Sequence, residues 1–294
     1  MSTPLVFDRS LVRLRLARAL KAGYADFLLA RAVEDLQERL STVLRTFSLA
    51  LDVGTPTPLA ADVLLRSGLA EGMVRLSPTP EPGSVLGDEE RLPFSGAKFD
   101  LAVSLLALQG VNDLPGALIQ IRRALKPDGL FVGALLGGSS LNELRQALTQ
   151  AEAELEGGVS PHVAPFADLR DIGGLLQRAG FALPVTDSDI IRVRYANAFA
   201  LMRDLRAMGL TNALNDRRRT PLKRGTLIRA AEVYAERFAD PDGRIPATFE
   251  IVWLSGWTPH ESQQKPLAPG SAKMRLADAL GVKEGETPAQ PEKE

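Results

Sequence analysis

Apolar residues recur at the helical period of 3.6 in the first part of the chain. Phe27, Leu36 and Leu40 belong to the clearest part of this pattern, so we expect one or two helices and no strand over 10–45. After this segment, short apolar runs alternate with helical patterns. The expected strands cover 48–54, 72–77, 85–87, 98–106 and 130–136, with helices over 59–67 and 112–125. Strands that alternate with helices are typical of a doubly wound parallel sheet.

Longer helical patterns dominate the second half of the chain. They predict helices over 141–156, 166–179, 197–208 and 226–238, and late strands over 190–195 and 247–254. A tight turn is expected at Lys126-Pro127-Asp128-Gly129, because these residue types favour turns. We expect one mostly parallel sheet with an antiparallel strand near 247–255.

The same patterns suggest three parts of the chain. A helical cap covers 1–45, and one α/β domain covers 46–260. The domain carries helical insertions at 140–180 and 197–240. Residues 261–294 combine prolines with alternating charges and are expected to form a flexible tail.

Composition narrows the classes of function. Of the 294 residues 45% are apolar and 24% are charged, as in an ordinary globular protein. The net charge of -1 gives no general attraction to nucleic acid, so no nucleic-acid partner is expected. The lack of cysteine excludes disulfides, cysteine-ligated metals and a thiol nucleophile. No run approaches the roughly 20 apolar residues of a membrane span, so none is expected.

The start of the chain is basic. Five positive residues stand against Asp8, as in an organelle transit peptide, but the apolar residues among them fit a folded amphipathic helix. The positive residues are Arg9, Arg13, Arg15, Arg18 and Lys21. We therefore expect a cytoplasmic protein.

Three segments of the first half resemble class I S-adenosylmethionine-dependent methyltransferases of the biotin-synthesis type, which act on a carrier protein. They are Gly87–Phe94, Phe99–Leu101 and Leu118–Gly129. The resemblance implies a Rossmann-like fold, with helices on both faces of a mostly parallel sheet and an N-terminal helical cap. It implies that Asp88 meets the adenine of the cofactor. The candidate cofactor-binding residues are Asp52, Gly54, Asp88, Glu89 and Ser104.

Two segments depart from the methyltransferase pattern. The first strand runs into Thr55-Pro56-Thr57-Pro58 instead of closely spaced glycines, and each proline removes a backbone N–H and restricts φ. The second strand ends in Arg75–Pro80 without the carboxylate that usually holds the ribose. A lost hydrogen-bonded partner costs about 1–3 kcal/mol. We therefore expect weak binding of S-adenosylmethionine.

A second resemblance covers nearly the whole chain. Its motifs are Phe7–Arg9, Ser160–Phe166, Leu176–Phe181, Leu201–Gly209, Pro246–Phe249 and Gly256–Ser262. They resemble the methyltransferase-fold family of respiratory complex I assembly factors, which is described in mitochondria as an arginine hydroxylase acting on a subunit of the peripheral arm. The resemblance implies a complex I subunit as partner. The match begins at residue 7, which leaves no room for a transit peptide and implies a bacterial relative.

Two histidines and one basic cluster are further candidates. His162 and His260 lie 98 residues apart in the sequence and match no local metal motif. They could join a carboxylate in a facial metal triad, or each could satisfy a loop or a helix end. The candidate carboxylates are Glu261, Asp187 and Asp189. The basic cluster could be a solvated helix end or could contact an acidic partner; it comprises Arg217, Arg218, Arg219, Lys223 and Arg224.

Three functions remain open from the sequence. The first is an enzyme that hydroxylates a protein arginine during complex I assembly. The second is an active methyltransferase on a small molecule or a carrier-protein thioester. The third is a cofactor-free binding factor with a degenerate methyltransferase fold. Neither the catalytic residues nor a metal ligand set follows from the residues, and no motif supplies the oxidant that hydroxylation needs.

Overall fold

The computed structural model describes residues 5–166 and 168–263. The chain divides into a compact unit over Met1–Pro259 and a second unit over His260–Glu294. The expected tail lies almost wholly outside the described residues, which end at 263.

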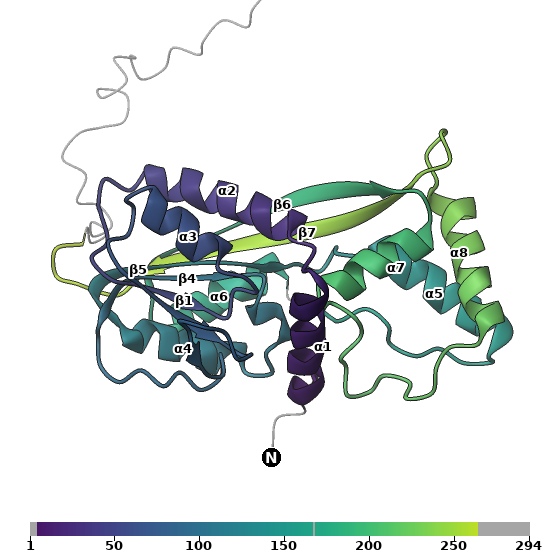
Figure 1. Cartoon of the computed structure of the whole chain (residues 1–294), viewed down its shortest axis with the longest axis horizontal. Coiled ribbons are helices and arrows are strands. Elements are labelled where there is room, and N and C mark those ends of the chain that lie inside the picture. The colour runs from purple at the N-terminus through teal and green to yellow at the C-terminus, as the bar shows by residue number, and fades with distance from the viewer. Residues whose placement is uncertain (1–4, 167, 264–294) are drawn as a thin grey trace, which may run out of the picture. The chain divides into compact units, whose positions relative to one another are not determined.

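A seven-stranded sheet forms the centre of the first unit, in the order β3-β2-β1-β4-β5-β7-β6 (Figure 1). β7 runs antiparallel to both its neighbours, and the other pairs are parallel, as the sequence predicts. The strands are β1 (Ala50–Val53), β2 (Met73–Ser77), β3 (Val85–Leu86), β4 (Phe99–Leu105), β5 (Leu125–Leu136), β6 (Ala182–Tyr195) and β7 (Ile245–Trp257).

Helices cover both faces of this sheet, which confirms the predicted fold class. The helices are α1 (Arg9–Ala22), α2 (Phe27–Ser41), α3 (Leu59–Arg66), α4 (Leu114–Ala124), α5 (Asn142–Leu155), α6 (Leu169–Ala179), α7 (Ala198–Ala207) and α8 (Arg224–Phe238). α2 and α3 pack on one face, where Leu36 and Leu64 meet Leu101 in a fully buried core. α4 and α6 pack on the other face, around buried residues such as Ile121 and Phe131.

Two local predictions need correction. The segment Lys126–Gly129 is not a turn that precedes a strand; it lies inside β5 as an irregularity of the ladder. Phe99 pairs with Leu125 and Leu101 with Leu130, so these residues bulge from β5 while Asp128 takes a positive φ of 59°. β6 begins at Ala182 instead of residue 190, because pairing with the long β7 orders the weakly apolar part of the strand.

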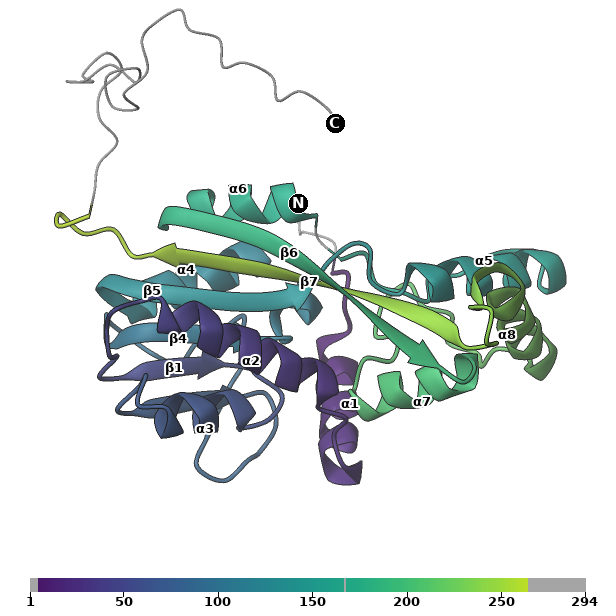
Figure 2. The same cartoon turned by 90° about the horizontal axis from the view of Figure 1, so that it is seen from above.

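One end of the sheet carries the second helical group. β6 and β7 extend beyond the parallel strands, and α5, α7 and α8 gather around their extensions (Figure 2). α1 stands between this group and the carboxyl ends of β1 and β4 (Figures 1 and 2). In doubly wound sheets, ligands bind at the carboxyl ends of the strands. We therefore expect a ligand site in the space beside α1, at the carboxyl ends of β1 and β4.

Candidate functional site

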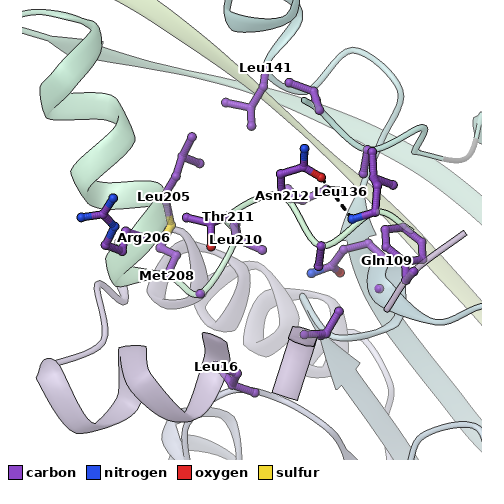
Figure 3. A pocket seen from close by; sticks show the side chains of 18 of the residues that line it. Leu16, Gln109, Leu136, Leu141, Leu205, Arg206, Met208, Leu210, Thr211 and Asn212 are labelled. Carbon is purple, nitrogen blue, oxygen red and sulfur yellow. Dashed lines mark hydrogen bonds between the residues drawn. The ribbon is translucent and has the colours of Figure 1, made fainter. Parts of the chain in front are cut away.

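A cavity of about 320 Å³ lies beside α1, between the carboxyl ends of the parallel strands and the second helical group. Its walls are mostly apolar (Figure 3). Leu205, Met208 and Leu210 line one side, and Leu136 and Leu141 line another. Its polar wall residues are Arg9, Arg13, Glu89, Gln109, His162, Arg206, Thr211 and Asn212. Ligand sites usually combine an apolar wall with a few convergent polar groups, and this cavity has that character.

Two leucines in the cavity wall have an unusual backbone. Leu106 follows β4 with a φ of 52°, and Leu141 precedes α5 with a φ of 55°. Both are non-glycine residues in the left-handed region, which costs free energy of about 1–3 kcal/mol each. Hydrogen bonds hold both in place, because Leu106 donates its N–H to the Ala134 carbonyl and Leu141 donates to Thr248. Such strain is concentrated at functional sites, which supports the assignment of this cavity.

Glu89 is a carboxylate buried in the cavity wall. Its side chain lies against Gly54, which ends β1 with a φ of +75°. A Cβ at Gly54 would come within 2.6 Å of Glu89 Oε1 and 2.8 Å of its Cγ, so any larger residue there would require the Glu89 side chain to shift. Burial raises the pKa of Glu89, although the nearby Arg9 opposes this. The carboxylate thus fills the space that opens above the first strand.

Arg9 and Arg13 of α1 hold the predicted acidic residues. The Arg9 guanidinium donates to Asp88 Oδ1 at 2.9 Å, to the Gly110 carbonyl at 3.0 Å and to Glu89. Arg13 donates to the other oxygen of Asp88. Burial raises the pKa of Asp88, but hydrogen bonds from the Glu90 amide and from Arg9 outweigh it, so the pKa lies below its ordinary value. Asp88 is therefore paired with two cations from the N-terminal helix.

Asp52 and Ser104 point into the protein rather than into the cavity. Asp52 is fully buried and accepts from Arg75 Nε at 2.9 Å, while Arg75 also donates to the Thr55 carbonyl. Burial raises the pKa of Asp52 to about 6, although Arg75 and Thr55 lower it. Ser104 is fully buried and donates to the Val53 carbonyl at 2.7 Å. Both residues stabilise the ends of the central strands.

The five candidate cofactor residues therefore do not leave an open place for S-adenosylmethionine in this arrangement. The structure brings Gly54 and Glu89 to the cavity wall, but Glu89 covers Gly54. Pro56, in the first loop, also lines the cavity and offers no backbone N–H. The contacts of the five residues with this cofactor stay a prediction.

His162 lies in the cavity wall and belongs to a polar cluster with Glu152 and Ser160. Its Nε2 lies 3.0 Å from Glu152 Oε2 and 3.2 Å from Ser160 Oγ. Burial raises the pKa of Glu152, but hydrogen bonds from Ser160 and His162 outweigh it and lower the pKa. His260 instead contacts Ser262 Oγ at 2.7 Å.

No metal centre forms within the described ranges. They contain no group of three or more histidine, aspartate or glutamate side chains placed to hold a metal ion. Asp187, a candidate ligand, is paired with both terminal nitrogens of Arg39 at 2.7 Å.

None of the helices in the described part of the chain has the length and apolar character needed to cross a bilayer.

The basic cluster is largely paired within the protein. Arg217 donates to Asp8 at 3.2 Å and to the Leu214 carbonyl at 2.7 Å. Arg218 and Lys223 both approach Glu156, at 3.3 and 3.0 Å. Arg219 is exposed. The sequence left a solvated helix end or contact with an acidic partner open for this cluster, whereas Arg217 and Arg218 pair with acidic residues of the chain itself that lie far away in the sequence.

Comparison with known proteins decides the family. A methyltransferase domain family matches residues 51–133. The chain is 41% identical over 286 residues to the mitochondrial arginine-hydroxylase NDUFAF5 of Danio rerio, covering 93% of this chain and 89% of the relative. The chain belongs to the NDUFAF5 arginine-hydroxylase family. This confirms the resemblance seen in the sequence.

This NDUFAF5-family protein is also similar to a carrier-protein methyltransferase in sequence and to a solved structure in fold. The malonyl-[acyl-carrier protein] O-methyltransferase of Laribacter hongkongensis is 34% identical over 286 residues, covering 90% of this chain and 94% of the relative. A solved Bacillus halodurans structure assigned as a methyltransferase aligns with a TM-score of 0.52 at 15% identity. That alignment covers 76% of this chain and 98% of the other, and it supports the fold alone.

Sequence reasoning missed the roles of Arg9, Arg13 and Arg75 in this NDUFAF5-family protein. Arg9 and Arg13 are four residues apart and thus share one helix face, which is a signal that the sequence contains. Their acidic partner Asp88 lies in a separate run of acids. Only the fold shows that this helix face meets those acids.

Proposed function

We propose that this protein hydroxylates an arginine of a complex I peripheral-arm subunit during complex I assembly. The observation that carries the proposal is the 41% identity to an arginine hydroxylase over 93% of the chain. That coverage includes the second half of the chain, which supplies Leu205, Met208 and Asn212 to the cavity. A cavity of about 320 Å³ with apolar walls suits the aliphatic part of an arginine side chain.

Hydroxylation of an arginine requires molecular oxygen and a two-electron reductant. Replacing one C–H hydrogen of arginine with hydroxyl takes one oxygen atom from molecular oxygen. A two-electron reductant and two protons reduce the other oxygen atom to water. Both co-reactants come from outside the protein. To the residues of this chain we assign the binding of the arginine and its shielding from water.

Mass spectrometry of complex I tests the proposal. In a strain that lacks this protein, one arginine of a peripheral-arm subunit should be lighter by the mass of one oxygen atom than in wild type. A plasmid copy of the gene should restore the wild-type mass. The control is the variant Arg18→Ala, which changes an exposed residue of α1 away from the ion pairs and should restore the mass fully. Unchanged arginine masses in the deletion strain would contradict the proposal.

A second candidate is methyl transfer from S-adenosylmethionine to a small molecule or a carrier-protein thioester. The methyltransferase domain match over 51–133 and the 34% identity to a malonyl-[acyl-carrier protein] methyltransferase favour it. Asp52, Gly54, Asp88, Glu89 and Ser104 would then contact the cofactor. Normal complex I in the deletion strain, together with tight cofactor binding, would place this candidate first.

The third candidate is a cofactor-free binding factor. The paired acids and the proline-containing first loop support it, because Arg9 occupies the carboxylates of Asp88 and Glu89 and the prolines offer no backbone N–H to the cofactor. A deletion strain with impaired complex I but unchanged arginine masses would support it.

The cytoplasmic location expected from the sequence also stays a prediction.

A further inference from the structure

The side chain of Arg9 occupies a binding site made by three acceptors. Its two terminal nitrogens reach a carboxylate oxygen of Asp88, a carboxylate oxygen of Glu89 and the carbonyl of Gly110. The Arg9 side chain is only 13% exposed and that of Glu89 4%. A planar guanidinium presents donors in a fixed fork, whereas an ammonium group is a point charge. The arrangement of acceptors is therefore specific for a guanidinium.

This site opens on the cavity. Glu89 and Arg9 both line the cavity wall, and Glu89 is the one acidic residue among the described residues that do so. An arginine side chain that entered the apolar space would find its carboxylate partner there. Elsewhere the wall offers the cation Arg206, which would repel it.

Arg9 does not satisfy all of its own hydrogen-bonding groups. Its Nε is buried and has no hydrogen-bond partner among the described residues. A buried donor without a partner costs free energy. This lowers the cost of exchanging Arg9 for another guanidinium that re-pairs Glu89 and Asp88.

α1, which carries Arg9, is held mainly at its polar side chains. Ala19 is its one fully buried residue. Its other attachments include Arg13 to Asp88 and Arg15 to the Asn212 carbonyl. Gly209, with a φ of +71°, lets the backbone of Leu16 approach the loop after α7 closely. Local openings draw on elements with few buried apolar contacts, and α1 is such an element.

Resting on the proposed function, we propose that Asp88, Glu89 and the Gly110 carbonyl form the site for the guanidinium of the target arginine. Arg9 fills this site in the free protein. The target arginine displaces Arg9 when α1 moves, and both carboxylates are paired before and after the exchange.

Peptide binding to the full chain tests this exchange. The probe is the capped peptide acetyl-Gly-Gly-Arg-Gly-Gly-amide, measured by calorimetry against wild type and Arg9→Ala. If the open state is about 1–10% populated, removing the competing side chain strengthens binding by about 10- to 100-fold. The matched control Arg18→Ala lies on the same helix, is exposed, and should bind the peptide as wild type does.

Two further measurements make the test specific. The double variant Arg9→Ala/Glu89→Gln should lose the gain, and the lysine version of the peptide should bind at least tenfold more weakly to Arg9→Ala. Binding by Arg9→Ala that is no tighter than that of wild type would overturn the proposal. If Arg9→Ala does not fold, as judged by thermal melting, Arg9→Lys gives the same readout, because lysine cannot reach all three acceptors as a fork.

Failure of the exchange can be distinguished from failure of the proposed function. The peptide assay involves no reaction, so failure of the exchange leaves the mass spectrometry of complex I unaffected. Hydroxylation in cells without an Arg9→Ala gain in peptide binding would mean that the target arginine binds elsewhere. A gain in peptide binding without hydroxylation would mean that the site serves a binding factor.

Discussion

Glu89 rests on Gly54, so that a Cβ at Gly54 would come within 2.6 Å of Glu89 Oε1. This contact joins the end of β1 to the loop after β3, at the carboxyl edge of the sheet, where doubly wound folds bind their ligands. Arg9 covers Glu89 from the other side.

Replacing Gly54 with alanine should destabilise the protein strongly. The substitution combines a positive φ with a clash against Glu89, and overpacking of this kind costs about 1–3 kcal/mol beyond the backbone strain. Gly68→Ala is the matched control, because Gly68 has a similar φ of +71° and nothing within 4 Å of the added Cβ. Urea unfolding should show a larger loss for Gly54→Ala. Equal losses would mean that Glu89 moves away freely.

Arg218→Glu should lower the free energy of unfolding, because Arg218 is paired with acidic residues of the chain. The new carboxylate would face Glu156 and the nearly fully buried Glu152, so that three acids would lie together. We expect a loss of about 2 kcal/mol in the free energy of unfolding. Arg219→Glu, at an exposed position, should change it by less than about 0.5 kcal/mol. Thermal unfolding of both variants measures the difference, and similar values would contradict the pairing.

Stability should depend on pH through Glu156. Hydrogen bonds from Thr226 and Lys223 lower the pKa of Glu156 to about 2. A carboxylate whose pKa is depressed in the folded state stabilises the protein above its unfolded pKa, and this contribution falls away as the pH drops from about 4.5 toward 2. The stability advantage of wild type over Glu156→Gln should therefore be constant near neutral pH and shrink below pH 4.5. An advantage that grew on acidification would contradict the lowered pKa.

S-adenosylmethionine should bind weakly. The carboxylate of Asp88 is paired with two arginines, and Glu89 fills the space above Gly54. We expect calorimetry with S-adenosylmethionine and with its demethylated product to give dissociation constants above about 1 μM, which corresponds to roughly -8 kcal/mol. A tighter value would show that α1 and Glu89 move aside at little cost. It would also favour the methyltransferase candidate.

Much of the fold could be predicted from the sequence alone. The buried runs in β1 and β4 are short and mostly apolar, and residues 130–136 of β5 are apolar throughout. Short apolar runs bounded by turn-forming residues are consistent with buried strands. The helices expected over 112–125 and 197–208 are present as α4 and α7, and each begins after an N-cap side chain that accepts a backbone N–H, Asp113 for α4 and Asn197 for α7. The bulge at Lys126–Gly129 could not be predicted, because a turn-forming sequence was incorporated into a ladder that pairs on both sides.

The sequence by itself determined the order of the elements and the family, because periodicity and motifs are local properties of the chain. Only the tertiary structure decided which charges meet. Arg9 and Asp88 are 79 residues apart, and Arg217 and Asp8 are 209 residues apart. The sequence does not show whether a charged side chain is hydrated or forms an ion pair with a carboxylate. Packing of α1 against the strand ends brings these partners together. As a result, Arg9 pairs with Glu89, and Asp8 pairs with Arg217 of the basic cluster.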